Sequence, residues 1–125
     1  MKGDKQMKTD ERTFSRLMKA YNRRVYWTNY GGFSKAQLDR ALDLILSGKA
    51  NLKKKGDKIY AAVESQSKMN YVYHVYIHNY CSCEYKKHLP FNERIGKTCV
   101  HELVRDLLYD CYILRQQEQE KALAH

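Results

Sequence analysis

The sequence predicts an α+β fold, in which two N-terminal helices precede a small antiparallel three-stranded sheet and a C-terminal helix. Three observations support this prediction. Apolar residues recur with helical spacing before residue 48, alternate with a period of two between residues 50 and 80, and return to helical spacing after residue 98. A chain of 125 residues fits one domain and can bury a real core.

The first expected helix runs from Thr9 or Asp10 to about Arg24, after a flexible basic arm at residues 1–9. Its apolar stripe has the spacing i, i+3, i+4, i+7 and consists of Phe14, Leu17, Met18 and Tyr21. The rest of its surface is basic and holds Arg12, Arg16, Lys19, Arg23 and Arg24. Glycines at 31 and 32 end the pattern. Residues 10–33 are therefore predicted to form a basic helix with a glycine-containing linker.

The second expected helix runs from Ser34 to about Ser47. Ser34 is a plausible N-cap, and Gln37 three residues later makes a weak capping box. The apolar face holds Leu38, Leu42 and Ile45. Gly48 can adopt the left-handed conformation that ends a helix.

Three strands are expected next, near Ala50–Lys53, Lys58–Ser65 and Asn70–Tyr80, with turns at 53–57 and 65–68. The last strand alternates, with Tyr73 and Val75 on one face and His74 on the other. The residues from 84 to 97 are expected to form a loop. A final helix follows from about Thr98 to Lys121, with Cys111 on its apolar face as a core residue, and residues 122–125 form a tail.

Charge is concentrated in the first half of the chain. Residues 1–69 hold 16 Lys and Arg against 7 Asp and Glu, a net charge of +9, whereas residues 70–125 hold 7 of each. A basic half indicates a polyanionic partner, most often nucleic acid, although a solvated surface is the alternative. Besides the five cations of the first helix, the candidate phosphate contacts are Lys53, Lys54, Lys55, Lys58, Lys86 and Lys87.

The chain contains no long apolar run, and its N-terminus lacks the apolar segment of a secretory signal. We therefore expect an intracellular protein, cytoplasmic or nucleoid-associated, without a membrane partner. In a reducing compartment, clustered cysteine and histidine are better interpreted as metal ligands than as disulfides.

Such a cluster is present at Cys81, Cys83, Cys99 and His101. Two cysteines at the end of a strand can converge where the chain turns, and a second pair can lie where a helix begins. Two alternatives remain: the cysteines are small buried hydrophobes, or one is a catalytic thiol paired with His101. His88 is the substitute ligand if His101 is not one.

The spacing C-x-C-x15-C-x-H resembles that of the SWIM zinc finger family. Flanking residues extend the resemblance over roughly residues 36–108: they are Ser47-Gly48, Gly56-Asp57, Ala61-Ala62-Val63, the segment from Tyr73 to Ile77, and Gly96. Two features depart from the family pattern. Val100 stands where lysine is common, and the spacer of 15 residues is long.

The resemblance implies a SWIM-type domain at residues 34–121, whose C-terminal helix is stapled to the sheet by one structural Zn²⁺ held by Cys81, Cys83, Cys99 and His101. It also implies binding to DNA, RNA or protein rather than catalysis. Nucleic acid is the expected partner. The alternative is an adaptor subunit of a recombination, repair or ribonucleoprotein complex, bound to a recombinase paralog or a ribonucleoprotein.

Overall fold

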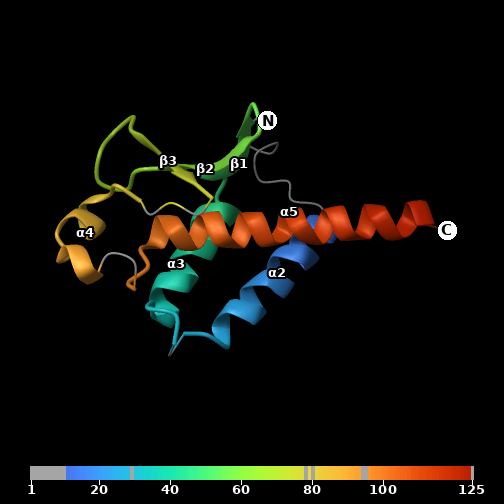
Figure 1. The fold of residues 1–125 in the computed structure, drawn as a ribbon, viewed down its shortest axis with the longest axis horizontal. Coiled ribbons are helices and arrows are strands. Elements are labelled where there is room, and N and C mark those ends of the chain that lie inside the picture. Colours follow the sequence, from blue (N-terminus) through green and yellow to red (C-terminus); the bar gives the residue numbers. More distant parts are fainter. Residues whose placement is uncertain (1–10, 29, 78, 80, 94–95, 125) are drawn as a thin grey trace.

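The computed structural model describes residues 11–28, 30–77, 79, 81–93 and 96–124. The predicted α+β class is confirmed: two helices precede a three-stranded antiparallel sheet, and a long helix ends the chain (Figure 1). The predicted basic arm at residues 1–9 lies outside the described residues. No helix in the described ranges is long and apolar enough to cross a bilayer.

Helix α2 spans Glu11–Val25, close to the predicted bounds. Its buried residues are Leu17 and Ala20, while Tyr21 packs at the edge of the core. Phe14, which we assigned to the apolar stripe, is 45% exposed and is not part of the core.

Helix α3 spans Lys35–Leu46, and both of its ends follow local signals. The Ser34 hydroxyl accepts the Gln37 N–H at 3.1 Å, and the Gln37 side chain accepts the Ser34 N–H at 2.8 Å, so the capping box is fully formed. Gly48 takes a φ of 79° just after the helix, as predicted.

The sheet consists of β1 (Ala50–Lys55), β2 (Lys58–Glu64) and β3 (Val72–Tyr76), in that order and antiparallel. Val63 lies opposite Ala50 on one side and Tyr73 on the other. Tyr73 and Val75 are buried and His74 is exposed, which confirms the predicted alternation.

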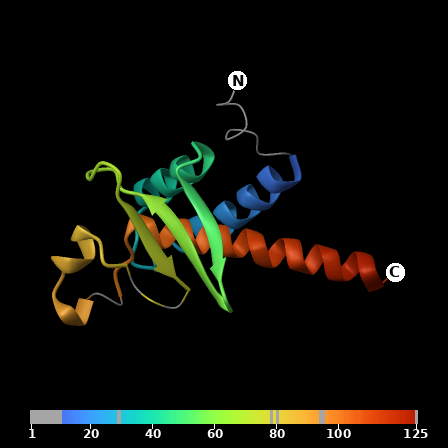
Figure 2. The same ribbon diagram turned by 90° about the horizontal axis from the view of Figure 1, so that it is seen from above.

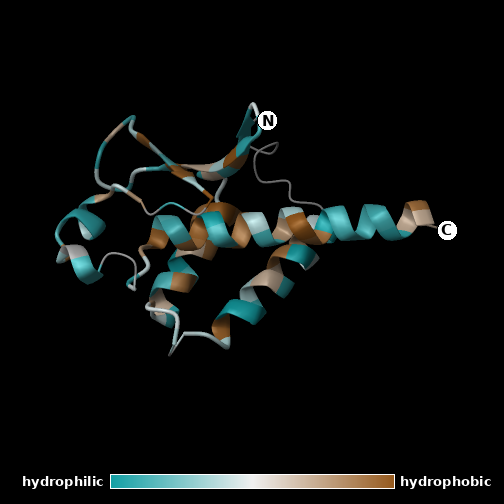
Figure 3. Cartoon of the chain, in the orientation of Figure 1, coloured by the Kyte–Doolittle hydropathy of each residue, from teal (hydrophilic) through white to brown (hydrophobic). Residues whose placement is uncertain are grey.

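Helix α5 spans Val100–Ala124 and lies between the sheet on one side and α2 and α3 on the other (Figures 1 and 2). Leu103, Val104 and Leu107 are fully buried in this central position. Cys111 is partly buried against the same core, as predicted. The last turns of α5 extend past the other elements and are mostly hydrophilic (Figures 2 and 3).

The expected loop at 84–97 is in part helical, which corrects the prediction. Helix α4 spans Glu84–Lys87, and a 3₁₀-helix spans Phe91–Glu93. The first helical bond of α4 runs from the Lys87 N–H to the Cys83 carbonyl at 3.0 Å. Such short turns lack the apolar periodicity on which the loop prediction depended.

Candidate metal centre

The fold brings two pairs of side chains together at one end of the molecule. Cys81 and Cys83 follow β3, whereas Cys99 immediately precedes α5 and His101 lies in its first turn. One potential ligand atom from each of the four residues lies within 4.8 Å of all the others, and the three cysteines are buried. Within the described ranges, this is the only group of Cys, His, Asp and Glu placed to hold a metal ion.

The separation between one sulfur and the imidazole matches that around a tetrahedral ion. The Cys81 Sγ lies 3.6 Å from the His101 Nδ1. A tetrahedron with metal–sulfur bonds near 2.3 Å and metal–nitrogen bonds of 2.0–2.1 Å requires a sulfur–nitrogen separation of about 3.6 Å. All four cysteines of the chain carry free thiols, so no disulfide competes for these sulfurs.

Local backbone structure explains how residues two apart can converge. Cys83 is the N-cap of α4, with φ −71° and ψ 168°, so the chain turns directly after the first pair. The Cys99 carbonyl accepts the Leu103 N–H at 3.1 Å, which makes Cys99 the residue that enters α5. The imidazole of His101 packs against the Tyr73 ring, with centroids 4.6 Å apart and the ring planes tilted by 30°. The predicted order of strand end, connecting segment and helix start is therefore present.

The three sulfurs perturb one another. Hydrogen bonding with the Cys83 side chain raises the pKa of the Cys81 thiol to about 12, and the same contact lowers the pKa of Cys83. Hydrogen bonding with Cys81 raises the pKa of Cys99. A coordinated cation would instead deprotonate its thiol ligands.

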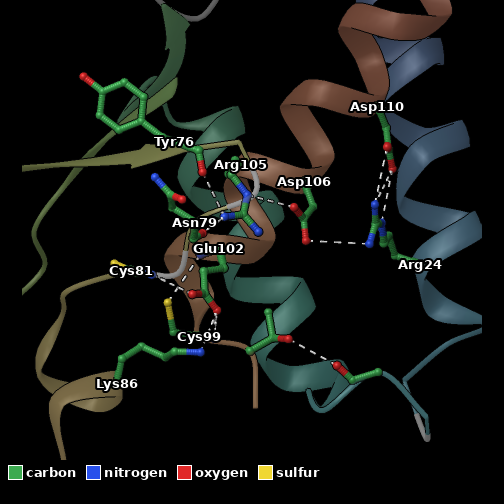
Figure 4. A network of polar contacts seen from close by, with 12 residues as sticks. Arg24, Tyr76, Asn79, Cys81, Lys86, Cys99, Glu102, Arg105, Asp106 and Asp110 are labelled. Atoms are coloured by element: carbon green, nitrogen blue, oxygen red, sulfur yellow. Dashed lines mark hydrogen bonds and ion pairs between the residues drawn. The ribbon is translucent and has the colours of Figure 1, made fainter. Parts of the chain in front are cut away.

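A buried ion pair lies against the cluster (Figure 4). The carboxylate of Glu102 is 3.1 Å from the Nζ of Lys86, and both residues are at most 3% exposed. Our sequence analysis missed Glu102. Its spacing in Cys99-Val100-His101-Glu102 matches a capping box with cysteine in place of serine, and this signal could have identified it.

Lys86 was predicted as a nucleic-acid contact, and this prediction is wrong. Its side chain is 2% exposed and turned inward, where the amine also donates to the carbonyl of Lys97. The neighbouring Lys87 is exposed. His88, the substitute ligand, has an 80% exposed side chain that lies 3.3 Å from the Glu84 carboxylate, and it is not part of the cluster.

The remaining predicted cations differ in their surroundings. Arg16 pairs with Glu118 at 2.7 Å, and Arg24 pairs with Asp110 at 3.1 Å, so both tie α2 to α5. Seven others are exposed: Arg12, Lys19, Arg23, Lys53, Lys54, Lys55 and Lys58.

A groove of about 320 Å³ joins two of the predicted basic segments. Its apolar lining comes mainly from β1, β2 and α5, and cations from β1, α2 and α5 surround it. These cations are Lys53, Lys54, Arg16 and Arg115. Residues of α2 and of the β1–β2 hairpin, distant in sequence, therefore share one basic surface.

The chain between α2 and α3 exposes three aromatic side chains that our sequence analysis did not select. Tyr26, Trp27 and Tyr30 are 72%, 49% and 75% exposed. The Trp27 ring meets the other two edge-on, at centroid distances of 5.1 and 6.1 Å. Large exposed aromatic groups are typical of binding surfaces.

No protein-family model, curated protein or solved structure matches this chain. The site is therefore defined by its own geometry and residue types, and the resemblance to SWIM zinc fingers stays a prediction.

Proposed function

We propose that this protein is a non-enzymatic, zinc-binding protein that binds nucleic acid through phosphate contacts. The observation that carries the proposal is the convergence of three cysteine sulfurs and one imidazole within 4.8 Å. The C-x-C-x15-C-x-H spacing, which resembles that of SWIM zinc fingers, supports the same assignment.

Zinc is the ion that these ligands favour. Thiolate and imidazole donors in a tetrahedral set are characteristic of structural Zn²⁺ sites. Cys81, Cys83, Cys99 and His101 would fill all four positions, which leaves no coordination site for a reactive water. The ion would then join the end of the sheet to the start of α5 and supply folding energy rather than Lewis-acid chemistry.

Metal analysis of gently purified protein tests this assignment. We expect about one zinc per chain, and we expect alkylation of the three clustered thiols to be slow until a chelator is added. A metal-free preparation that also fails to take up added Zn²⁺ would refute the zinc site. Rapid alkylation of one low-pKa thiol would instead favour the catalytic-thiol alternative.

The nucleic-acid proposal is supported by the basic surface around the groove. Lys53, Lys54 and Lys55 are exposed on β1, and two of them share the groove with the exposed Arg115. Cations gathered in this way bind phosphates and release counterions, which gives affinity with little sequence reading.

Charge reversal of Lys53, Lys54 and Lys55 to glutamate should weaken binding to unrelated nucleic-acid sequences by a similar factor. Reversal of Lys35, Lys49 and Lys68, which are exposed elsewhere, changes the net charge equally and serves as the matched control. Wild-type affinity should fall steeply between about 50 and 200 mM salt. Equal losses in the two triple variants would contradict a localised binding surface.

The second candidate function is that of a protein adaptor, and the exposed aromatic group Tyr26, Trp27 and Tyr30 favours it. Tyrosine and tryptophan are enriched where protein partners bind most strongly. Binding through these rings should depend only weakly on salt and should be lost in Trp27→Ala. The salt dependence of partner binding therefore separates the two functions.

A further inference from the structure

One carboxylate links the two halves of the cysteine–histidine cluster. The Oε2 atom of Glu102 accepts the backbone N–H of Cys81 at 2.6 Å, and its Oε1 atom accepts the backbone N–H of Cys99 at 3.1 Å (Figure 4). These two cysteines belong to different pairs, on either side of α4. The Glu102 carboxylate therefore sets the distance between the backbones of Cys81 and Cys99, two of the four candidate ligands.

Lys86 completes this arrangement from a third element. It lies on α4, directly after the first cysteine pair, and its amine donates to Glu102 Oε1 and to the carbonyl of Lys97, two residues before Cys99. The amine thus bridges the chain that follows the first pair and the chain that leads to the second.

Stability alone is a poor explanation for the ion pair. Removing two charges from water is expensive, and well-packed apolar residues in place of a buried pair are often equally or more stabilising. The ion pair also fixes the relative position of two backbone segments, because its hydrogen bonds end on the backbone of Cys81, Lys97 and Cys99.

We propose that Glu102 and Lys86 are positioning residues for the metal ion, which hold the two ligand pairs at the separation that the ion requires. This inference rests on the proposed zinc function. Replacing a residue that hydrogen-bonds to metal ligands commonly changes the affinity for the metal about 10–100-fold.

Glu102→Gln is the direct test. Glutamine has the same shape but only one oxygen, so one of the two cysteine N–H groups faces an amide donor instead of an acceptor. We expect the affinity for Zn²⁺, measured by competition with a chromophoric chelator, to fall about 10–100-fold. We also expect the absorption spectrum of the Co²⁺-substituted protein to depart from that of the wild type.

Two controls separate positioning from general destabilisation. Glu118→Gln changes an exposed glutamate of the same helix that does not contact the cluster. Val104→Ala removes buried volume from α5 without changing a side chain that hydrogen-bonds to the backbone of Cys81 or Cys99. Both folded variants should bind Zn²⁺ as the wild type does, with an unchanged Co²⁺ spectrum.

The double variant Glu102→Gln/Lys86→Met removes both charges and leaves side chains of similar length. We expect it to recover stability relative to Lys86→Met alone, which leaves a buried carboxylate without its cation, but not to recover Zn²⁺ affinity. If Glu102→Gln does not fold, the double variant takes its place.

Wild-type Zn²⁺ affinity and Co²⁺ spectrum in either of these two variants would overturn the positioning role and leave the zinc site intact. Failure of the wild type to bind Zn²⁺ would overturn the zinc site and the positioning role together.

Discussion

Cys99 immediately precedes α5 and Cys111 lies within it, and their neighbours give the two thiols different chemistry. The Cys99 sulfur lies among two further sulfurs and an imidazole and accepts the Glu102 N–H at 3.4 Å. Cys111 is partly buried against apolar residues, and burial raises the pKa of its thiol to about 11. A coordinating thiolate is therefore expected at the first position and a packed neutral thiol at the second.

Serine substitutions at these two positions should separate the roles. Cys99→Ser should release the metal and lower the free energy of unfolding by several kcal/mol, since structural zinc contributes about 10–16 kcal/mol in isolated peptides. Cys111→Ser should retain one zinc per chain and cost only about 1–2 kcal/mol, as expected for a hydroxyl in a partly apolar site. Metal analysis and urea unfolding measure both effects, and equal zinc content in the two variants would contradict the ligand assignment.

At the scale of elements, the connection between α2 and α3 is packed against the chain that enters α5. The Thr98 N–H donates to the Gly32 carbonyl at 2.9 Å, and the Thr98 hydroxyl donates to the Gly31 carbonyl at 3.2 Å. Gly32 has a φ of 78°, and a Cβ built there would lie 2.0 Å from the Gly96 carbonyl oxygen. Two backbones thus touch at a point where no side chain fits, three residues before Cys99.

We predict that Gly32→Ala destabilises the fold more than Gly56→Ala. Gly56, in the β1–β2 turn, also has a positive φ of 64°, but a Cβ there meets nothing within 4 Å. Both variants incur the left-handed penalty of about 1–2 kcal/mol, and Gly32→Ala must in addition push the two backbones apart. Thermal unfolding of the pair measures the difference, and equal melting temperatures would show that the contact at Gly96 is not required.

At the scale of the whole molecule, α5 is the element on which the others assemble. It contacts α2, α3 and all three strands. Ion pairs from Arg16 to Glu118 and from Arg24 to Asp110 hold α2 along it. The candidate metal centre lies where this helix begins, and its three buried cysteines adjoin the same core. We therefore expect metal removal to act first on the segments that carry these residues.

Chelation should accelerate amide hydrogen exchange between residues 81 and 101 before it affects β1, β2 and α3. The core that holds those elements includes Leu38, Val63 and Val104, none of which belongs to the candidate metal centre. Local opening needs less free energy than unfolding the whole domain, which typically requires about 5–15 kcal/mol. Exchange at 81–101 that is unchanged by chelator would count against a metal that organises this segment.

The sequence by itself determined the element types, the alternation of buried and exposed residues along β3, and the two Cys/His pairs of the candidate metal centre. These features depend on neighbours in the chain: apolar periodicity, caps such as Ser34 with Gln37, and ligands two residues apart. Helix capping and apolar periodicity act over three or four residues, so they can be recognised in the sequence without knowledge of the tertiary structure. The helical turns at 84–87 and 91–93 were missed because they are too short to carry a period.

Only the tertiary structure decided which of the predicted Lys and Arg side chains remain exposed to a binding partner. Lys86 looked like its neighbour Lys87, yet it is buried against Glu102, and Arg16 is paired with Glu118 from the far end of the chain. The residues next to a charged side chain in the sequence do not indicate its ion-pair partner, because the packing of distant elements brings the two together. The same reason explains why the basic groove between α2 and the hairpin, and the carboxylate behind the cysteines, appeared only in three dimensions.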